Sequence, residues 1–173
     1  MSLKPKDPLL AAVRVVLFIA MGAMAVASAA TLIAAPAIVL YRDAVLAQLA
    51  ADGAPAEALG ALVAIMALVS LCAALGFLFF RHMYRIVGTV GEGDPFIPAN
   101  ARRLSAMGWI VVAVNVASIP LVSILRWLES VTEHLHTDAG HDIDGLLLAL
   151  VLFILARVFR EGTRLRDEVE GTV

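Results

Sequence analysis

Long apolar runs separated by short polar segments constrain this chain more than any other feature of its sequence. The first run covers residues 9–40 and is interrupted only by Arg14, the second covers 58–80 and the third 104–125. About 20 apolar residues in a helix are enough to cross the hydrocarbon core of a bilayer. Lipid offers no partners to backbone polar groups, whereas a helix pairs them internally. The runs therefore predict an all-α integral membrane protein.

A fourth apolar run is shorter. Residues 145–156 carry no charge, but this stretch falls short of the roughly 17 residues that a crossing usually needs. Val158 and Phe159 continue it past Arg157, whose long side chain can extend to the lipid headgroups. We expect a tilted or locally thinned crossing, with a shallow re-entrant hairpin as the alternative. The four expected spans are residues 9–40, 58–80, 104–127 and 144–160.

Composition supports this class. The chain is 61% hydrophobic and only 16% charged, against about 45–50% apolar and about 25% charged residues in a soluble domain. A cleaved signal peptide is the rival interpretation of the first run, because Ala27-Ser28-Ala29 resembles a cleavage site. The run continues through residues 31–40, beyond the point where a signal peptide would end. We therefore favour a spanning helix.

Positive charge is sorted between the polar segments, and this predicts orientation. In a four-span arrangement only Arg42 and Arg126 fall on one side. The crowded side is cytoplasmic by the positive-inside rule, so both termini lie inside a bacterial inner membrane and the loops 41–56 and 129–144 lie outside. The basic residues on the cytoplasmic side are Lys4, Lys6, Arg14, Arg81, Arg85, Arg102, Arg103, Arg157, Arg160, Arg164 and Arg166.

The sequence predicts one domain, residues 1–173, with a cytoplasmic hinge at 81–103 and a cytoplasmic C-terminal helix at 157–170. Within the hinge, glycines at 91 and 93 and the Asp94-Pro95 step predict a turn. Pro98 suits the first turn of the following helix. Two tryptophans, at 109 and 127, bracket the third span, as expected for aromatic belts at opposite interfaces.

The outer segment 129–144 is rich in side chains that can bind metal. His134, His136, His141 and Asp138 can converge if the loop folds back, and imidazole and carboxylate ligands suit a divalent transition metal. Their spacing matches no strong signature. The alternative is an acidic loop whose histidines are merely solvated, and we favour it.

Asn115 is the polar residue nearest the middle of the third span. Its amide needs a partner on another helix, because lipid offers none. A substrate or ion contact is the functional interpretation, and a hydrogen bond between helices is the structural one. We favour the structural interpretation.

The hinge and the C-terminal segment together resemble a known family. The pattern Gly93-Asp94-Pro95-Phe96, then Asn100, Arg102-Arg103-Leu104 and Gly108-Trp109, and the ending VFREGTRLRDEVEGTV are similar to the bacterial membrane family of domain of unknown function 2975. The resemblance covers most of the chain. It implies a small, multi-pass protein whose gene often lies beside one for a helix-turn-helix regulator of the Xre type. The metal-binding residue types of the outer loop do not belong to that pattern.

Two classes of function follow. The first is a regulatory or binding protein whose cytoplasmic surface docks a small soluble partner, such as an Xre-type regulator. The second is a small transporter or channel subunit, with an outer-loop metal or pH sensor as a weaker idea. A homo-oligomer is compatible with each. The expected partner-binding residues are Asp94, Pro95, Phe96, Asn100, Arg102, Arg103, Arg160 and Arg164.

The sequence does not favour an enzyme. It contains no nucleophile paired with a base and no phosphate-binding glycine loop, since Gly91-x-Gly93 alone is too weak a signal. The single cysteine, Cys72, lies in an apolar run and cannot form a disulfide within the chain. We expect no cofactor. We expect no direct binding of nucleic acid, because the basic residues are spread along the inner interface and form no DNA-reading module.

Overall fold

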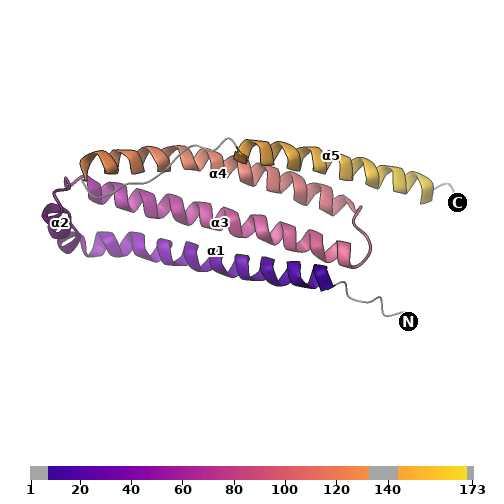
Figure 1. Cartoon of the computed structure of the whole chain (residues 1–173), viewed down its shortest axis with the longest axis horizontal. Coiled ribbons are helices and arrows are strands. Elements are labelled where there is room, and N and C mark those ends of the chain that lie inside the picture. Colours follow the sequence, from indigo (N-terminus) through magenta and orange to yellow (C-terminus); the bar gives the residue numbers. More distant parts are fainter. Residues whose placement is uncertain (1–7, 133–143, 171–173) are drawn as a thin grey trace. The chain divides into compact units, whose positions relative to one another are not determined.

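The computed structural model describes residues 8–132 and 144–170, and the secondary structure in these residues is helical (Figure 1). This confirms the prediction of an all-α protein. The helices, in chain order, are α1 (Pro8–Leu40), α2 (Arg42–Ala51), α3 (Ala58–Gly91), α4 (Pro98–Val131) and α5 (Asp144–Glu170).

Three helices in the described part of the chain are long and apolar enough to cross a membrane, namely α1, α3 and α4. Helix α5 is not among them, because Arg157, Arg160 and Glu161 interrupt its apolar sequence. The chain therefore has the character of a multi-pass membrane protein.

The long helices extend beyond the spans that the sequence predicts. Helix α3 has 34 residues, and at about 1.5 Å per residue it is roughly 50 Å long, whereas the hydrocarbon core is about 30 Å thick. Residues 81–91 of the expected hinge belong to α3, and residues 98–103 belong to α4. The connector between these two helices is therefore only residues 92–97.

The expected polar loop 41–56 contains helix α2. Its sequence, RDAVLAQLAA, consists mostly of residues with good helix propensity. The helix ends at Ala51, and Gly53, two residues later, has a φ of 71° and a backbone N–H that donates to Ala50 O. The N–H of Ala54 donates to Leu49 O, which completes a Schellman motif. The polar composition of residues 41–56 predicts that the segment lies outside the membrane, but it does not predict this short helix.

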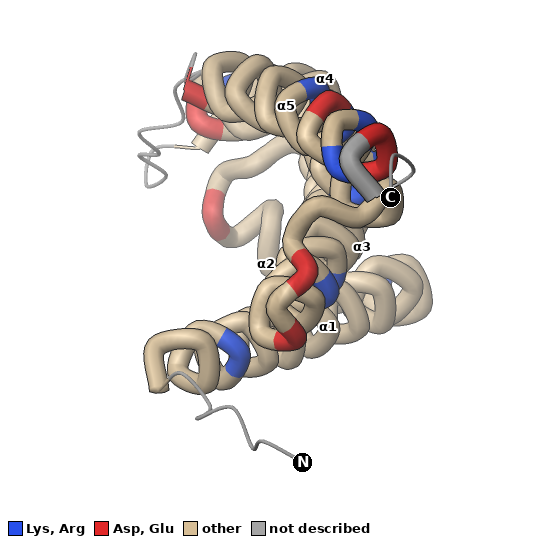
Figure 2. The backbone as a smooth tube through the Cα atoms, turned by 90° about the vertical axis from the view of Figure 1, so that its right-hand side faces the viewer, with Lys and Arg blue, Asp and Glu red and all other residues tan. Residues whose placement is uncertain are grey.

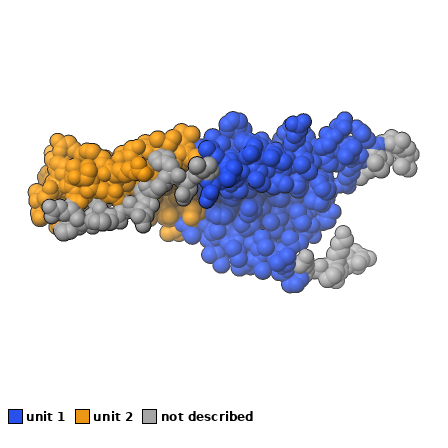
Figure 3. All heavy atoms as spheres, turned by 45° about the horizontal axis from the view of Figure 1, so that its top comes forward, with its two compact units in different colours: residues 1–23, 76–112, 144–173 blue, residues 24–75, 113–143 orange. Residues whose placement is uncertain are grey.

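The chain divides into two compact units, which are described separately (Figure 3). Unit 1 contains residues 1–23, 76–112 and 144–173, and unit 2 contains residues 24–75 and 113–143.

The core of unit 1 lies where α3, α4 and α5 meet. Met107 of α4 is only 1% exposed, and the small residues Ala149 and Ala156 of α5 are also buried. Small side chains allow two helices to approach closely. At Gly108, a Cβ atom would lie 2.8 Å from the ring of Phe153, so this ring packs directly against the backbone of α4. The core residues are Leu104, Met107, Val111, Ala149, Leu152 and Ala156, with Phe79, Met83 and Ile86 packed against them.

In unit 2, a pair of serines joins α1 to α3. The hydroxyl of Ser28 donates to the backbone oxygen of Ser70 (3.1 Å), and the hydroxyl of Ser70 donates to the backbone oxygen of Ser28 (3.0 Å). Such bonds contribute about 0.6 kcal/mol each between helices in a membrane. The apolar core of this unit contains Ala54, Ala58, Ile65 and Leu128.

Candidate functional site

The connector 92–97 begins with a defined helix stop. Gly93 has a φ of 89°, a backbone conformation that residues with a Cβ rarely adopt. Its N–H donates to Val90 O, and the N–H of Asp94 donates to Thr89 O, which is the hydrogen-bond pattern of a Schellman motif. Helix α4 then begins at Pro98. The turn predicted from Gly93 and the helix start predicted at Pro98 are both confirmed.

Asn100 holds the connector to both flanking helices. Its amide nitrogen donates to the hydroxyl of Thr89 in α3 (2.7 Å) and to the carbonyl of Pro95 in the connector (2.9 Å). Its amide oxygen accepts a hydrogen bond from the Arg103 guanidinium in α4 (2.8 Å). The residue is 0% exposed. Asn100 therefore fixes the path of the connector and offers no surface to a partner.

The connector also packs against α5. The ring of Phe96 lies 5.2 Å from that of Phe159, measured between centroids. A Cβ atom at position 162 would lie 2.8 Å from the Phe96 ring, so only glycine leaves space for it there. Beside this contact, Arg166 forms an ion pair with Asp94, 72 residues earlier in the chain. These contacts hold the C-terminal half of α5 beside the connector.

Helix α1 contacts the same end of α3. The Arg14 guanidinium donates to the carbonyl of Gly88 (3.1 Å) and lies against Gly91, where a Cβ atom would be 3.3 Å away. A cation near the last carbonyl groups of a helix is favourable, since the helix dipole is negative at that end. Arg14, the one charge in the first apolar run, is thus accommodated by the end of α3.

The structure separates the predicted partner-binding residues into two groups. The first group makes contacts within the chain: Asn100 is buried, Asp94, Pro95 and Arg103 are half-buried, and Phe96 packs on Phe159 although it is still exposed. Arg102 and Arg160 are exposed. The exposed Arg164 pairs with Glu161 (2.6 Å) and Glu168 (3.6 Å), and its hydrogen bond to Glu161 raises the pKa of its guanidinium.

The predicted metal site of the outer loop and the intramembrane residue Asn115 are not among the contacts described around the connector. The proposed metal ligands His134, His136, His141 and Asp138 lie outside the described residues. Within residues 8–132 and 144–170, no three potential metal ligands of the His, Cys, Asp or Glu type cluster together. Asn115 is partly buried in α4, in unit 2, and its backbone carbonyl accepts a hydrogen bond from Ser118 (2.7 Å).

The comparison with protein families covers nearly the whole chain. Residues 6–173 match the family model described as a protein of unknown function, DUF2975. The chain belongs to the DUF2975 family. This confirms the resemblance carried by the connector and the C-terminal segment. The curated proteins and the solved structures gave no match to this DUF2975 chain.

Sequence reasoning missed most of the partners of the connector. Thr89 belongs to no motif, Phe159 was noted only in the fourth apolar run and the C-terminal pattern, and Arg166 is one of several arginines in that pattern. Gly162 is the exception, because a glycine inside a helix weakens it unless something packs closely there. That glycine is the local signal that could have indicated a contact on this face of α5, although we did not predict one from it.

Replacing Asn100 tests whether its amide holds the connector. We expect Asn100→Ala to lower the free energy of unfolding by about 2 to 4 kcal/mol, since three hydrogen bonds are lost and buried partners are left unpaired. The measurement is SDS-induced unfolding in mixed micelles. Arg102→Gln, at an exposed neighbour, should change the same quantity by no more than about 0.5 kcal/mol. Equal stability of the two variants would contradict this role.

Proposed function

We propose that this chain is a four-span protein of the bacterial inner membrane whose cytoplasmic face binds a small soluble protein, such as an Xre-type helix-turn-helix regulator. The binding surface is the outward face of the last turns of α5, together with the exposed Arg102. The observation that carries the proposal is an exposed apolar side chain on a charged helix segment that the connector holds in place.

The exposed side chain is Leu165, which is 51% exposed. It follows the apolar segment 145–156 by more than two helical turns, so it lies beyond the part of α5 that we place in lipid. Figure 2 shows that basic and acidic residues alternate over this end of the helix. An apolar side chain surrounded by charges is a typical anchor for a protein partner, because the charged rim supplies specificity around a desolvated centre.

The fixed position of α5 supports the same proposal. Phe96 packs on Phe159 at Gly162, and Asp94 pairs with Arg166, while Leu165 is left exposed. A surface that is already ordered loses little conformational entropy on binding, which favours affinity. The connector residues therefore act on a partner indirectly, by positioning the helix that it contacts.

The distribution of arginines between the two units supports the proposed orientation. The arginines of unit 2 are Arg42 and Arg126, and the other arginines of the chain belong to unit 1. Arg14, which interrupts the first apolar run near its beginning, contacts the end of α3 within unit 1. By the positive-inside rule we place unit 1 toward the cytoplasm.

Reporter fusions test the proposed topology. A cytoplasmic reporter fused after residue 92 or 173 should be active, and a periplasmic reporter should be active after residue 50 or 137. The fusion after residue 137 is the sharpest, because it separates α4 from α5. A cytoplasmic signal there would contradict the four-span arrangement, as would a periplasmic signal after residue 173.

Affinity purification of the full chain in mild detergent tests the partner. We expect a small cytoplasmic protein with a helix-turn-helix domain, identified by mass spectrometry. Leu165→Asp should weaken its binding by about tenfold or more, as for a central apolar anchor. Asp43→Lys is the matched control, since this residue of α2 is also exposed but belongs to unit 2.

Recovery of the same protein in equal amount with Leu165→Asp would exclude this surface. Recovery of the chain alone would exclude the regulatory role. The transporter, channel and outer-loop sensor alternatives stay predictions of the sequence, since no contact in the described residues adds support to them.

A further inference from the structure

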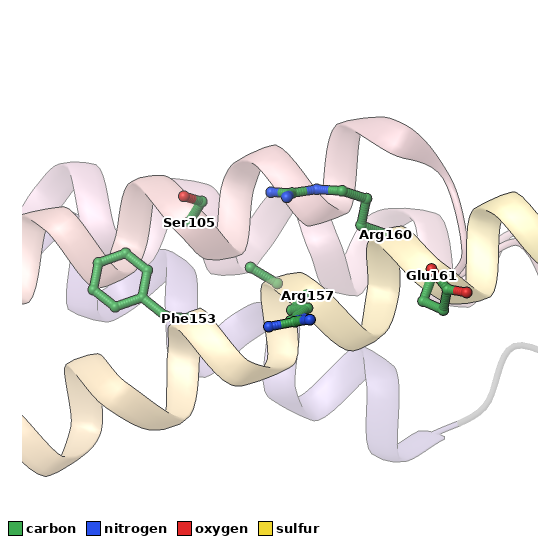
Figure 4. Close-up of a pocket in the computed structure, with 6 residues that line it drawn as sticks. Ser105, Phe153, Arg157, Arg160 and Glu161 are labelled. Atoms are coloured by element: carbon green, nitrogen blue, oxygen red, sulfur yellow. The ribbon is translucent and has the colours of Figure 1, made fainter.

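A cavity of about 380 Å³ lies between α4 and α5 in unit 1 (Figure 4). Volumes of about 300 to 1,000 Å³ are typical of small-molecule sites. Ser105 lines it from α4, and the remaining lining residues come from α5. These are Phe153, Ala156, Arg157, Arg160 and Glu161. None of these residues belongs to the contact between the connector and α5.

One end of the cavity is aromatic. Phe153 packs on the backbone of α4 at Gly108, and its ring makes an edge-on contact with that of Trp109, with centroids 5.4 Å apart. Trp109 is 65% exposed. An exposed tryptophan at the end of an apolar helix segment is typical of the boundary between lipid tails and headgroups.

The other end of the cavity is basic. Arg157 and Arg160 are both exposed, and in residues 8–132 and 144–170 neither guanidinium has a carboxylate or carbonyl partner. Figure 4 shows Arg160 extending from α5 toward α4, on the side of Ser105. The carboxylate of Glu161 is engaged by Arg164. Two cationic groups and a hydroxyl are thus available to a ligand.

We propose that this cavity binds the phosphate group of an anionic phospholipid. Arg157, Arg160 and Ser105 contact the phosphate oxygens, and the lipid tails lie along Phe153 and Trp109. The sequence supports both the phosphate group and the lipid tails of this ligand. The arginines that would bind the phosphate come just after the apolar segment 145–156, which would lie beside the tails.

The chemistry of the two ends selects this ligand. Guanidinium groups bind phosphate oxygens through paired, charge-assisted hydrogen bonds, which a surface ammonium group cannot reproduce. A soluble anion would use the basic end alone and gain nothing from the aromatic end. A phospholipid without net charge would keep its own cation beside the phosphate and compete with the arginines.

The inference rests on the proposed placement of residues 145–156 in the membrane, which the reporter fusions test separately. It does not depend on a protein partner. A failed lipid titration with correct topology would remove only the lipid site, and a failed partner search would leave the lipid site standing.

The test is thermal unfolding of the full chain in detergent during titration with phosphatidylglycerol. We expect phosphatidylglycerol to raise the unfolding temperature and phosphatidylcholine to have little effect. In the double variant Arg157→Gln/Arg160→Gln the apparent affinity for phosphatidylglycerol should fall by about tenfold or more. Arg81→Gln, at an exposed arginine of α3 that does not line the cavity, should retain the wild-type response.

Two further arms separate the sources of the phosphate. Inorganic phosphate at the same concentration should leave the unfolding temperature unchanged, and an equal rise would show a soluble anion site instead. Arg157→Lys/Arg160→Lys retains the charge but not the paired hydrogen bonds, so its affinity should lie between those of the wild type and the glutamine variant. An unchanged response of the glutamine variant would overturn the proposal, as would equal effects of the two lipids.

Discussion

The hydrogen bonds of the buried Asn100 amide are the interaction on which the packing of unit 1 depends. Its donors and its acceptor are satisfied by Thr89, Pro95 and Arg103, so one side chain joins α3, the connector and α4. A buried polar group is costly unless it is fully paired, and this requirement allows only one path for residues 92–97. That path presents Phe96 and Asp94 to α5, and through them it sets the position of the last helix.

Two flanks of α5 make different contacts, one with the connector and one with the cavity beside α4. Phe159, Gly162 and Arg166 face the connector and secure the helix. On another flank Arg157 and Arg160 line the cavity beside α4, where we place a lipid phosphate. Leu165 remains exposed, and there we propose that a protein partner binds. A helix held on one flank by the chain and on another by lipid would present that surface with little freedom of movement.

Sequence patterns predicted the parts of the fold that depend on local constraints. The apolar runs indicated α1, α3 and α4, Gly93 indicated the turn, and Pro98 indicated the start of α4. The short helix α2 was not predicted, since a polar composition does not distinguish a loop from an exposed helix. The role of Asn100 was predicted as partner binding, but burial makes it structural. The pairing of Asp94 with Arg166 had no sequence signal, because many charges of both signs compete over that distance.

Hydrogen exchange measured by mass spectrometry on Asn100→Ala tests the central claim most directly. If Asn100 positions α5 through the connector, exchange should accelerate both in residues 89–103 and in residues 159–168. Exchange in residues 58–75 of unit 2 should stay as in the wild type, which provides the internal control for global loss of stability. Acceleration confined to residues 89–103, with α5 unchanged, would contradict the account.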